Sequence, residues 1–592
     1  MKKKAEHILD FLAYNSEHNL GLTKFMDKKG NYTTYSHQEL FNIGKKYANY
    51  YLSIGVKEDE VISIMLPTGI DLLGAFLGAQ FIKAVPTFLY PPISLSDINK
   101  WLQSTNKMMG EVNSKILITD ALIYSVMNRG DVTILDSQIR LTTESKSHLE
   151  DFEYIAKNYS ANSLCFLQFS SGTTGSPKAV KITQKNVISN VEAMYKKFGI
   201  DGTSFKGVSW LPIYHDMGLV GSFLGSIIHA TEATFIRPDD FIRKPYLWLK
   251  AISDQKANIT VAPNFAYGLC VKRTPPEMLE SLDLSSLEIA LCGAEFIHKS
   301  TMDKFNETFS QCGLSESALT PVYGMAEATL GVTFSDMTRP VLFKTFDRQW
   351  LSKSIAKEST SGVTICSVGR PLEDMQVKIK NTKNKELIHG QIGEIYVSGP
   401  SVTTGYYKNI EKTNKTIINN ELKTGDQGFI FEDELYICGR SKETLVIRGR
   451  NYYPTSFEEK IFKIEGIREG RVIVTSKLCS ETDTEEVLVL AEVKNAKLIK
   501  DLESSMKSQI QKSFENSGLA PKDIVLLPPG FLPKTTSGKL KRKEALAILE
   551  LSAIDHDQKI RSSYFSEFFS KTMFLLDHSF LRVKILIADL KN

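Results

Sequence analysis

The chain has 592 residues, of which 72 are Lys or Arg and 68 are Asp or Glu, so its formal net charge is only +4. A chain of this length exceeds what one hydrophobic core usually supports, which predicts more than one domain. The near balance of charge gives no support for sustained binding to nucleic acid or anionic lipid. Seven scattered cysteines, none in a CxxC pair, indicate a reducing, cytoplasmic location and no zinc site.

The N-terminal segment MKKKAEHILDFLAYNSEHNL has the basic start of a secretion signal, but Glu6, His7 and Asp10 interrupt the apolar run that such a signal needs. No stretch of about 18 uncharged apolar residues occurs in the chain. We therefore expect neither export nor a transmembrane segment.

Roughly the first 440 residues repeat one pattern, in which a short apolar run ends in a glycine-rich or polar loop and a helical pattern follows. Examples of these runs are SLCFLQF (163–169), GVSWLP (207–212) and LEIALCG (287–293). This alternation predicts an α/β fold. Because ligands collect at the carboxyl ends of the strands in such sheets, we expect the loops to face one crevice.

The loop SSGTTGSPKAV (170–180) concentrates hydroxyl and glycine residues before a single lysine. Such a loop can turn its backbone N–H groups around an anion, which predicts phosphate binding. Its G-x-x-G-x-x-K spacing differs from the GxxxxGK[ST] of a P-loop kinase, and GxGxxG is absent from it. The alternative is an ordinary flexible surface loop.

After Gly425 the pattern changes to that of a compact α+β unit, with a boundary near Arg440. GFIFEDELYICGR (428–440) predicts a hairpin that turns at Asp433 and Glu434, and ETLVIRG (443–449) predicts a strand. Thr455 and Glu458 form a predicted capping box at the start of a helix. Further strands are expected at 471–476, 487–493 and 523–528, with a helix at about 498–516. The last 40 or so residues suggest terminal elements on the surface.

Five motifs occur in an order that resembles a known family: SSGTTGSPKAV, YGMAEAT (323–329), KTGDQG (423–428), GRSKETLVIRGRNYYP (439–454) and PKTTSGKLKR (533–542). Together they resemble the adenylate-forming superfamily of acyl-CoA synthetases, nonribosomal adenylation domains and firefly luciferase. The resemblance implies a large α/β domain of layered sheets and helices at 1–439, a hinge at 440–444, and a smaller mobile α+β lid with a terminal extension at 445–592. It also implies that the protein uses ATP and Mg²⁺ to activate a carboxylic acid.

The resemblance assigns nucleotide-binding roles to four regions. The 170–180 loop holds the β- and γ-phosphates, Tyr323 and the 293–295 segment enclose adenine, and Asp426 accepts hydrogen bonds from the ribose hydroxyls with help from Arg440. Taken alone, Lys178 would more often be a solvated lysine and Tyr323 a core residue. The implied residues are Ser171, Gly172, Thr173, Thr174, Gly175, Lys178, Gly293, Ala294, Glu295, Tyr323, Gly324, Met325, Asp426 and Arg440.

Three further residues receive roles in the reaction by resemblance. Lys539 inserts between the substrate carboxylate and the α-phosphate, two anions that repel until a cation offsets their charge. Glu327 is linked to Mg²⁺ bridging the phosphates, because a hard oxygen ligand suits that ion. Lys442 is the hinge at which the small domain rotates. Outside its motif, Lys539 would be a plain basic helix start.

Two positions depart from the family pattern. Ala179 stands where glycine is usual, and we expect it to begin the next strand. Glu443 stands where aspartate is commoner.

Four segments resemble fatty acyl-AMP ligases, which activate long-chain acids for the phosphopantetheine thiol of a carrier protein: WLPIYHDMGL (210–219), residues 64–92, APNFAYGLC (262–270) and GRNYYP (449–454). The 42 positions from Glu327 to Gly369 exceed what we expect of an acyl-CoA ligase by roughly twenty, and loops of that length are usually functional. The implied insertion spans about 338–362, with apolar residues that could anchor it on the large domain. These are Phe343, Phe346, Trp350, Leu351 and Ile355.

The acid is expected to be apolar. In GLVGSFLGSIIHA (218–230), small residues at 218, 221, 222 and 225 leave room for an acyl chain or, almost as plausibly, allow close helix packing. The FDxS motif that holds an amino group in nonribosomal domains is absent. His215 is expected beside the carboxylate, where a neutral imidazole could shape the tunnel.

Three functions therefore remain open. The first is a fatty acyl-AMP ligase that serves a separate acyl-carrier protein, or the carrier domain of a polyketide or nonribosomal synthase. The second is a long-chain acyl-CoA ligase. The third is a catalytically silent adenylate-binding module, against which the presence of Glu327, Asp426 and Lys539 argues.

Overall fold

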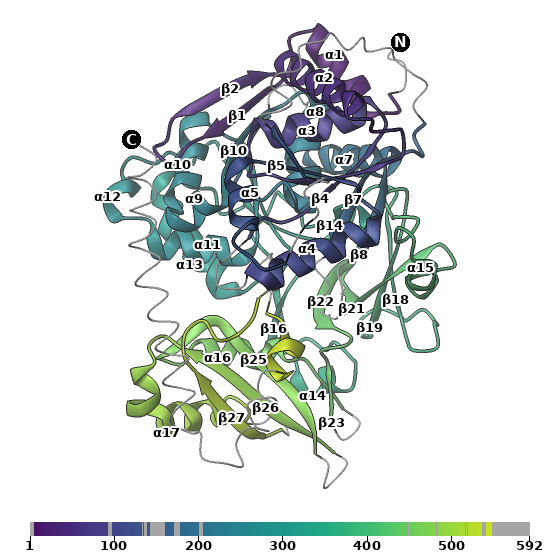
Figure 1. Ribbon diagram of the computed structural model, residues 1–592. Coiled ribbons are helices and arrows are strands. Elements are labelled where there is room, and N and C mark those ends of the chain that lie inside the picture. Colours follow the sequence, from purple (N-terminus) through teal and green to yellow (C-terminus); the bar gives the residue numbers. More distant parts are fainter. Residues whose placement is uncertain are drawn as a thin grey trace.

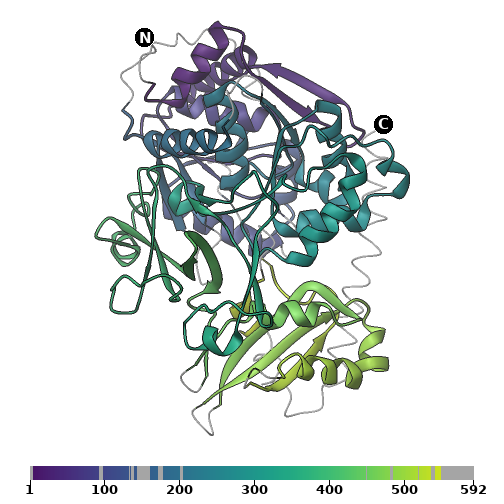
Figure 2. The same ribbon diagram turned by 180° about the vertical axis from the view of Figure 1, so that it is seen from behind.

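The computed structural model describes residues 5–92, 98–132, 134, 139–142, 160–170, 178–199, 205–447, 450–479, 484–515, 517, 519–534 and 540–547. Figure 1 shows a large upper part that contains the N-terminus, a small sheet at its side, and a lower part formed by the C-terminal elements. Figure 2 shows the same division from behind. The expected combination of a large α/β part and a smaller α+β part is confirmed.

A nine-stranded sheet forms one layer of the large part. Its strands from β13 to β1 run parallel, while β14, β17 and β2 add antiparallel edges. Because the carboxyl ends of parallel strands meet at one edge, the loops after β9, β11, β12 and β13 lie together. The strand order is β17 (Arg370–Pro371), β14 (Gly331–Phe334), β13 (Leu319–Gly324), β12 (Ile289–Cys292), β11 (Ile259–Ala262), β9 (Lys206–Ser209), β10 (Glu232–Ile236), β1 (Leu22–Met26) and β2 (Tyr32–Ser36).

A six-stranded sheet forms the second layer. It is parallel except for the antiparallel pair β7 and β8, whose adjoining ends, Ser170 and Lys178, belong to the 170–180 motif and pair with each other. Ala179 is the second residue of β8, as expected. The strand order is β6 (Ile139–Leu141), β5 (Ile116–Thr119), β3 (Val61–Met65), β4 (Val85–Phe88), β7 (Leu164–Ser170) and β8 (Lys178–Thr183).

Helices join these two sheets through a shared hydrophobic core. The buried ring of Phe76 in α3 lies 5.8 Å from Phe88 of the six-stranded sheet and 6.0 Å from Phe223 in the helix η4. Helices α2 and α3 approach so closely that a Cβ at Gly78 would lie only 2.4 Å from Cβ of Tyr47. The helices are α1 (Ile8–Glu17), α2 (His37–Ser53), α3 (Ile70–Phe81), α4 (Ile98–Val112), α5 (Ala121–Met127), α7 (Gln184–Phe198), the π-helix η4 (Met217–Leu224), α8 (Gly225–His229), α9 (Pro238–Arg243), α10 (Tyr246–Gln255), α11 (Asn264–Arg273), α12 (Pro276–Leu279), α13 (Lys299–Phe309), and the short 3₁₀ helices η5 (Ser310–Cys312) and η6 (Ala326–Ala328).

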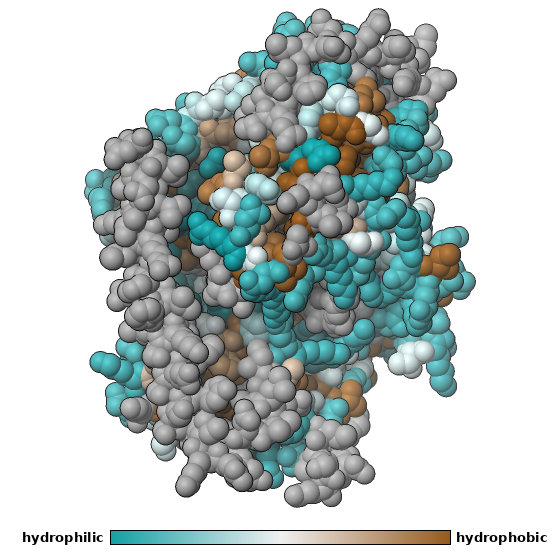
Figure 3. Space-filling model, in the orientation of Figure 1, coloured by the Kyte–Doolittle hydropathy of each residue, from teal (hydrophilic) through white to brown (hydrophobic). Residues whose placement is uncertain are grey.

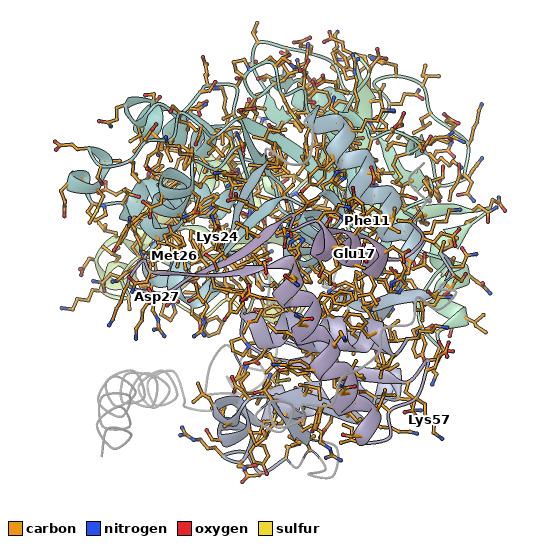
Figure 4. All side chains as sticks on the ribbon, turned by 90° about the horizontal axis from the view of Figure 1, so that it is seen from above. Phe11, Glu17, Lys24, Met26, Asp27 and Lys57 are labelled. Atoms are coloured by element: carbon orange, nitrogen blue, oxygen red, sulfur yellow. The ribbon has the colours of Figure 1, made fainter. Side chains whose placement is uncertain are left out.

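The N-terminal elements complete the upper part. Figure 4, seen from above, shows Phe11 and Glu17 on α1 and Lys24 and Met26 on the neighbouring β1. Lys24 donates to Glu232 of β10 at 2.9 Å, which ties this edge of the sheet to its interior strands. Hydrophilic residues cover much of the visible surface in Figure 3. Within the described ranges, no helix has both the length and the apolar character to cross a bilayer.

A small antiparallel sheet lies beside the large part. Its long hairpin, β21 and β22, turns at Glu432 and Asp433, both with positive φ, one residue earlier than expected. The elements here are β15 (Phe343–Phe346), α14 (Arg348–Ser352), β16 (Val363–Cys366), β18 (Gln376–Lys380), β19 (Gly393–Ser398), α15 (Ile410–Thr416), β20 (Ile417–Ile418), β21 (Glu421–Phe431) and β22 (Glu434–Arg440).

The lower part has its own apolar core and a three-stranded sheet, β25–β26–β27. The predicted strands and the predicted helix are present. Two ion pairs hold this part against the upper one: Lys100 of α4 with Glu544 at 2.6 Å, and Lys272 of α11 with Glu469 of β25. The elements are β23 (Leu445–Ile447), β24 (Arg450–Tyr452), α16 (Thr455–Phe462), β25 (Ile467–Cys479), β26 (Thr484–Val493), α17 (Lys497–Lys512) and β27 (Pro521–Leu527).

The predicted capping box at Thr455 is wrong. The N-cap of α16 is Pro454, which has no side-chain hydrogen bond. The hydroxyl of Thr455 instead faces the carbonyl of Cys438 at 3.5 Å. Glu458 turns inward, where its carboxylate accepts from the backbone N–H of Val474 at 2.8 Å and pairs with Arg542. Arg542 therefore binds the carboxylate of Glu458, which a capping box would have placed at the N-terminus of α16.

Candidate active site

A cavity of about 740 Å³ lies where the carboxyl ends of the nine-stranded sheet face the β21–β22 hairpin and the lower part. Residues predicted to bind the nucleotide line it, among them Tyr323, Asp426 and Arg440. Residues of the segment predicted to hold the acyl chain, such as Gly221, line it too, together with Met217 and apolar residues of α7. Arg471, Lys534 and Leu540 of the lower part complete the wall. The upper part and the C-terminal segment therefore line the same cavity.

Asp426 is the centre of a short polar chain. Its Oδ2 accepts from the hydroxyl of Tyr323 at 2.7 Å, and its Oδ1 pairs with Nε of Arg440 at 2.8 Å. The β21–β22 ladder aligns Asp426 directly with Arg440, so the hairpin register fixes this pair. Burial, with the charge of Asp426, raises the pKa of Tyr323, and the charge of Asp426 raises the pKa of Arg440. The side chain of Asp426 therefore lies between a neutral phenol and a cation.

The small residues of the predicted adenine pocket are fixed by neighbouring backbone. A Cβ at Gly324 would lie 1.9 Å from the carbonyl oxygen of Leu330, and one at Gly293 would lie 2.9 Å from that of Val322. Gly293 is not among the described residues that line the cavity, whereas Gly324 is. Close contact with neighbouring backbone therefore requires glycine at both positions.

Three other members of that predicted pocket do line the cavity: Ala294, Glu295 and Met325. Ala294 has a φ of +67°, an uncommon value for a residue other than glycine. The carboxylate of Glu295 accepts from the backbone N–H of Phe265 at 2.6 Å, next to the start of α11. The fold thus holds this segment at the edge of the sheet.

Glu327 lies in the η6 turn that follows β13 and lines the same cavity. Its Oε1 accepts from the hydroxyl of Tyr406 at 2.9 Å, and its backbone carbonyl accepts from Thr403 at 2.8 Å. No described residue donates to its second carboxylate oxygen. A single carboxylate with a free hard oxygen fits Mg²⁺, which commonly binds one or two protein carboxylates plus water and substrate phosphates.

Several predicted residues lie outside the described ranges: Ser171, Gly172, Thr173, Thr174 and Gly175 of the phosphate loop, and Lys539. Residues that flank Lys539 are described. Lys534 and Leu540 form an antiparallel bridge, and both line the cavity. The chain therefore enters and leaves the segment that contains Lys539 at the cavity wall.

Arg542 anchors that segment on its C-terminal side. The partly buried guanidinium binds both carboxylate oxygens of Glu458, donates through Nε to Glu443 at 3.0 Å, and donates to the carbonyl of Val474 at 3.3 Å. Glu443 directly follows the predicted hinge residue Lys442. One arginine thus joins the hinge region, α16 and β25 to the end of the 533–542 motif.

The other end of the cavity is apolar and aromatic. Its lining includes Gly221 and Ser222 of η4, together with Tyr195, Phe198 and Phe205. By contrast, a Cβ at Gly218 would lie 2.3 Å from the carbonyl of Pro212, and one at Gly225 would lie 3.3 Å from the ring of Tyr195. Gly218 and Gly225 therefore allow close packing, whereas Gly221 and Ser222 border the cavity.

His215 lines the cavity at the start of this helix, and its Nδ1 lies 2.5 Å from Oδ1 of Asp216. Cys366 also lines the cavity, although it is buried. Burial, with the charge of Glu434, raises the pKa of the Cys366 thiol well above its usual value. The thiol is therefore protonated at neutral pH.

The predicted insertion folds as β15 and α14 and packs on the β21–β22 hairpin. The ring of Phe346 is fully buried, with its centroid 5.0 Å from that of Phe429 and 5.4 Å from that of Phe431. The side-chain amide of Asn451 in β24 donates to the hydroxyl of Ser354 at 3.0 Å. The insertion therefore contacts the lower part as well. Leu351 is buried, while Trp350 and Ile355 are exposed.

Three cavity or network residues had no assigned role in the sequence: Tyr406, Lys534 and Arg542. Lys534 and Arg542 stand within the PKTTSGKLKR motif, so that motif was the available signal. Tyr406 lies in a loop whose contact with Glu327 spans 79 positions, and no local pattern indicates it.

Comparison with known proteins identifies the family of the chain. The AMP-binding enzyme family matches residues 13–407. The chain is 30% identical over 516 residues to the long-chain-fatty-acid–AMP ligase FadD23 of Mycobacterium tuberculosis, covering 82% of this chain and 85% of the relative. It is also 30% identical over 514 residues to the putative fatty-acid–CoA ligase fadD21 of Mycobacterium leprae, covering 81% and 86%.

A solved structure agrees with these matches. It comes from structural and functional studies of fatty acyl-adenylate ligases from E. coli and L. pneumophila, has a TM-score of 0.86 and 26% identity, and covers 93% of this chain and 99% of that one. The family match, these relatives and the two-part fold identify an ATP-dependent, AMP-forming ligase. The chain belongs to the AMP-binding enzyme family.

Proposed function

We propose that this protein joins a long-chain fatty acid to AMP and transfers the acyl group to the phosphopantetheine thiol of a separate carrier protein. In the first step a carboxylate oxygen bonds to the α-phosphorus of ATP and the bond to the β-phosphate bridge breaks, which releases pyrophosphate. In the second step the thiol sulfur bonds to the acyl carbonyl and AMP leaves. The observation that carries the proposal is the shared cavity, whose lining combines Asp426 and Arg440 with apolar and aromatic residues of α7.

The nucleotide end supplies binding and orientation. Each carboxylate oxygen of Asp426 has two acceptor positions, so the bonds to Tyr323 and Arg440 leave capacity for the ribose hydroxyls. The ring of Tyr323 offers a flat face for adenine. Glu327 would hold Mg²⁺ through its free oxygen, and the ion would neutralise charge on the phosphates.

Lys539 acts on the reacting groups. We place its ammonium between the fatty-acid carboxylate and the α-phosphate, where it offsets the repulsion between the two anions. The neighbouring residues support this assignment, because Lys534 and Leu540 line the cavity and Arg542 fixes the segment beyond them. The phosphate loop, residues 171–175 with Lys178, would hold the β- and γ-phosphates.

The acyl end would take the hydrocarbon chain between η4 and α7, with His215 beside the carboxylate. Rotation at Lys442 would then move the small part, 445–592, away from the adenylation position and admit the carrier. The insertion at 338–362 contacts both parts, so we propose that it restricts this rotation and disfavours free CoA.

The acceptor is tested by a direct comparison. The purified protein is incubated with a long-chain acid, ATP and Mg²⁺, and then with either CoA or a phosphopantetheinylated carrier protein. We expect acyl-adenylate to accumulate without acceptor and to be consumed by the carrier. Rapid formation of acyl-CoA would favour the CoA ligase, the function named for the relative from M. leprae.

The same assay separates catalysis from simple adenylate binding. Lys539→Ala should abolish acyl-adenylate formation while ATP still binds, because the lysine acts on the reacting groups. Unchanged turnover in this variant would contradict the role of Lys539. Absence of turnover in the unmodified protein with every acid would favour the silent module.

A further inference from the structure

The helix α15 is attached beside the start of β8. The segment that precedes it pairs with β8 through a bridge between Tyr406 and Val180, and the backbone N–H of Tyr407 donates to the carbonyl of Ala179 at 2.8 Å. Asn409 caps the helix by accepting from the backbone N–H of Lys412 at 2.9 Å. The fold therefore holds the first turn of α15 next to the strand that begins at Lys178.

Tyr406 connects this turn to the cavity. Its hydroxyl donates to Glu327 at 2.9 Å, while the ammonium of Lys412 lies 5.6 Å from the centroid of the same ring. A cation within about 6 Å of an aromatic face is attracted by the ring. Lys412 is thus positioned near Glu327 by a residue that contacts both.

The charges around this position are mostly positive. Lys178 and Lys442 lie close enough to repel Lys412, and Glu327 is the carboxylate that attracts it. Within the described parts of the chain, none of these lysines forms an ion pair. Lys415, one turn further along α15, differs because it pairs with Glu411 at 2.5 Å.

Gathering these lysines around one carboxylate costs electrostatic energy unless an anion of higher charge is present. In agreement, burial and repulsion from Lys178 and Lys442 lower the pKa of Lys412. An anion placed here would lie beside Glu327, on the side where the phosphate-loop lysine Lys178 begins β8. Lysine ammonium groups bind phosphates as point charges, without the fixed geometry of arginine.

We infer that Lys412 binds the β- and γ-phosphates of ATP and the pyrophosphate formed from them. This inference rests on the proposed function, which places a nucleotide in the cavity. It adds a cation from α15, a helix outside all five motifs, to the polyphosphate end of the site. AMP lacks both phosphates, so its binding should not involve Lys412.

The test compares nucleotides at equilibrium. Binding of ATP, ADP and AMP is measured by calorimetry with Mg²⁺ and without any acid or carrier, for the unmodified protein, Lys412→Ala and Lys415→Ala. We expect Lys412→Ala to weaken ATP binding by about tenfold, as for one charge-assisted contact, and to leave AMP binding unchanged. Lys415→Ala, on the same helix, should bind all three like the unmodified protein. Lys412→Arg should retain most of the ATP affinity because it keeps the charge.

The outcomes are distinct. Equal weakening of AMP and ATP in Lys412→Ala would show a structural role and overturn the inference, as would an unchanged ATP affinity. Either result leaves the proposed function standing, because the measurement does not involve the acid or the carrier. If the unmodified protein bound no ATP, both the inference and the proposed function would be rejected.

Discussion

The hydroxyl of Tyr323 donates to Asp426 at 2.7 Å, although the two residues are 103 positions apart in the sequence. Their contact joins the end of β13 to the β21–β22 hairpin, and Arg440 pairs with the opposite oxygen of Asp426. We expect Asp426→Ala to weaken AMP and ATP equally, by about tenfold to a hundredfold, because ribose contacts are common to both nucleotides. Calorimetry measures this. Tyr323→Phe keeps the aromatic ring, so its affinity for both nucleotides should fall less than that of Asp426→Ala. If Asp426→Ala lost affinity for ATP but not for AMP, the ribose assignment would be contradicted.

The small residues of η4 give a prediction about the length of the acid. Gly221→Leu should place a side chain in the cavity and reduce adenylation of a long-chain acid such as palmitate at least tenfold more than that of octanoate. Adenylation is followed as pyrophosphate release. Gly110→Leu is the matched control, because Gly110 is an exposed helical glycine with no atom within 4 Å of an added Cβ. Equal losses for both acids would show that Gly221 does not contact the chain.

Substitutions at Glu458 and Thr455 test whether Glu458 forms an ion pair with Arg542 or a capping box with Thr455. Glu458→Gln removes the buried carboxylate that binds the partly buried guanidinium of Arg542 and should lower the free energy of unfolding by about 3 kcal/mol. Thr455→Ala should change it by less than about 0.5 kcal/mol, since its hydroxyl caps nothing. Urea unfolding measures both. Similar losses of about 1 kcal/mol in the two variants would restore the capping box.

Lys534 predicts a pH dependence of stability. Partial desolvation at the cavity wall, with repulsion from Arg471, lowers the pKa of Lys534 from 10.5 to about 8. Between these values the unfolded chain keeps a proton that the folded lysine has lost, so this residue makes the free energy of unfolding rise with pH. Below about pH 8 both states are protonated and the slope vanishes.

Lys534→Met removes this titration. In urea unfolding between about pH 8 and 10, the free energy of unfolding of the unmodified protein should therefore rise relative to that of Lys534→Met. Lys543→Met, at an exposed lysine nearby, should follow the unmodified protein. Parallel curves for Lys534→Met and the unmodified protein would show that Lys534 titrates normally.

The sequence predicted those parts of the fold that local patterns determine. Strands such as β7, β12 and β26 are short apolar runs, and the motif order indicated which loops meet at the sheet edge. The turn at Glu432 and Asp433 was misplaced by one residue because Asp433 and Glu434 suit a turn equally well by composition. Such errors of register do not alter the site.

The remainder depends on contacts between distant segments. Nothing near Glu458 in the sequence shows that Arg542, 84 positions later, captures its carboxylate. Likewise Gly218 and Gly221 are indistinguishable in sequence, yet one faces the carbonyl of Pro212 and the other the cavity. These distinctions arise only when the sheets and helices pack.

The protonated thiol of Cys366 has a consequence for an enzyme that makes a mixed anhydride. Acyl-adenylates react with thiolates, and a thiolate in the cavity wall would capture the acyl group before any carrier arrived. Because Cys366 stays protonated, and because the other cysteines whose side chains are described are also buried, these six thiols are protected from acylation. The activated acid is thereby preserved for a thiol that enters from outside.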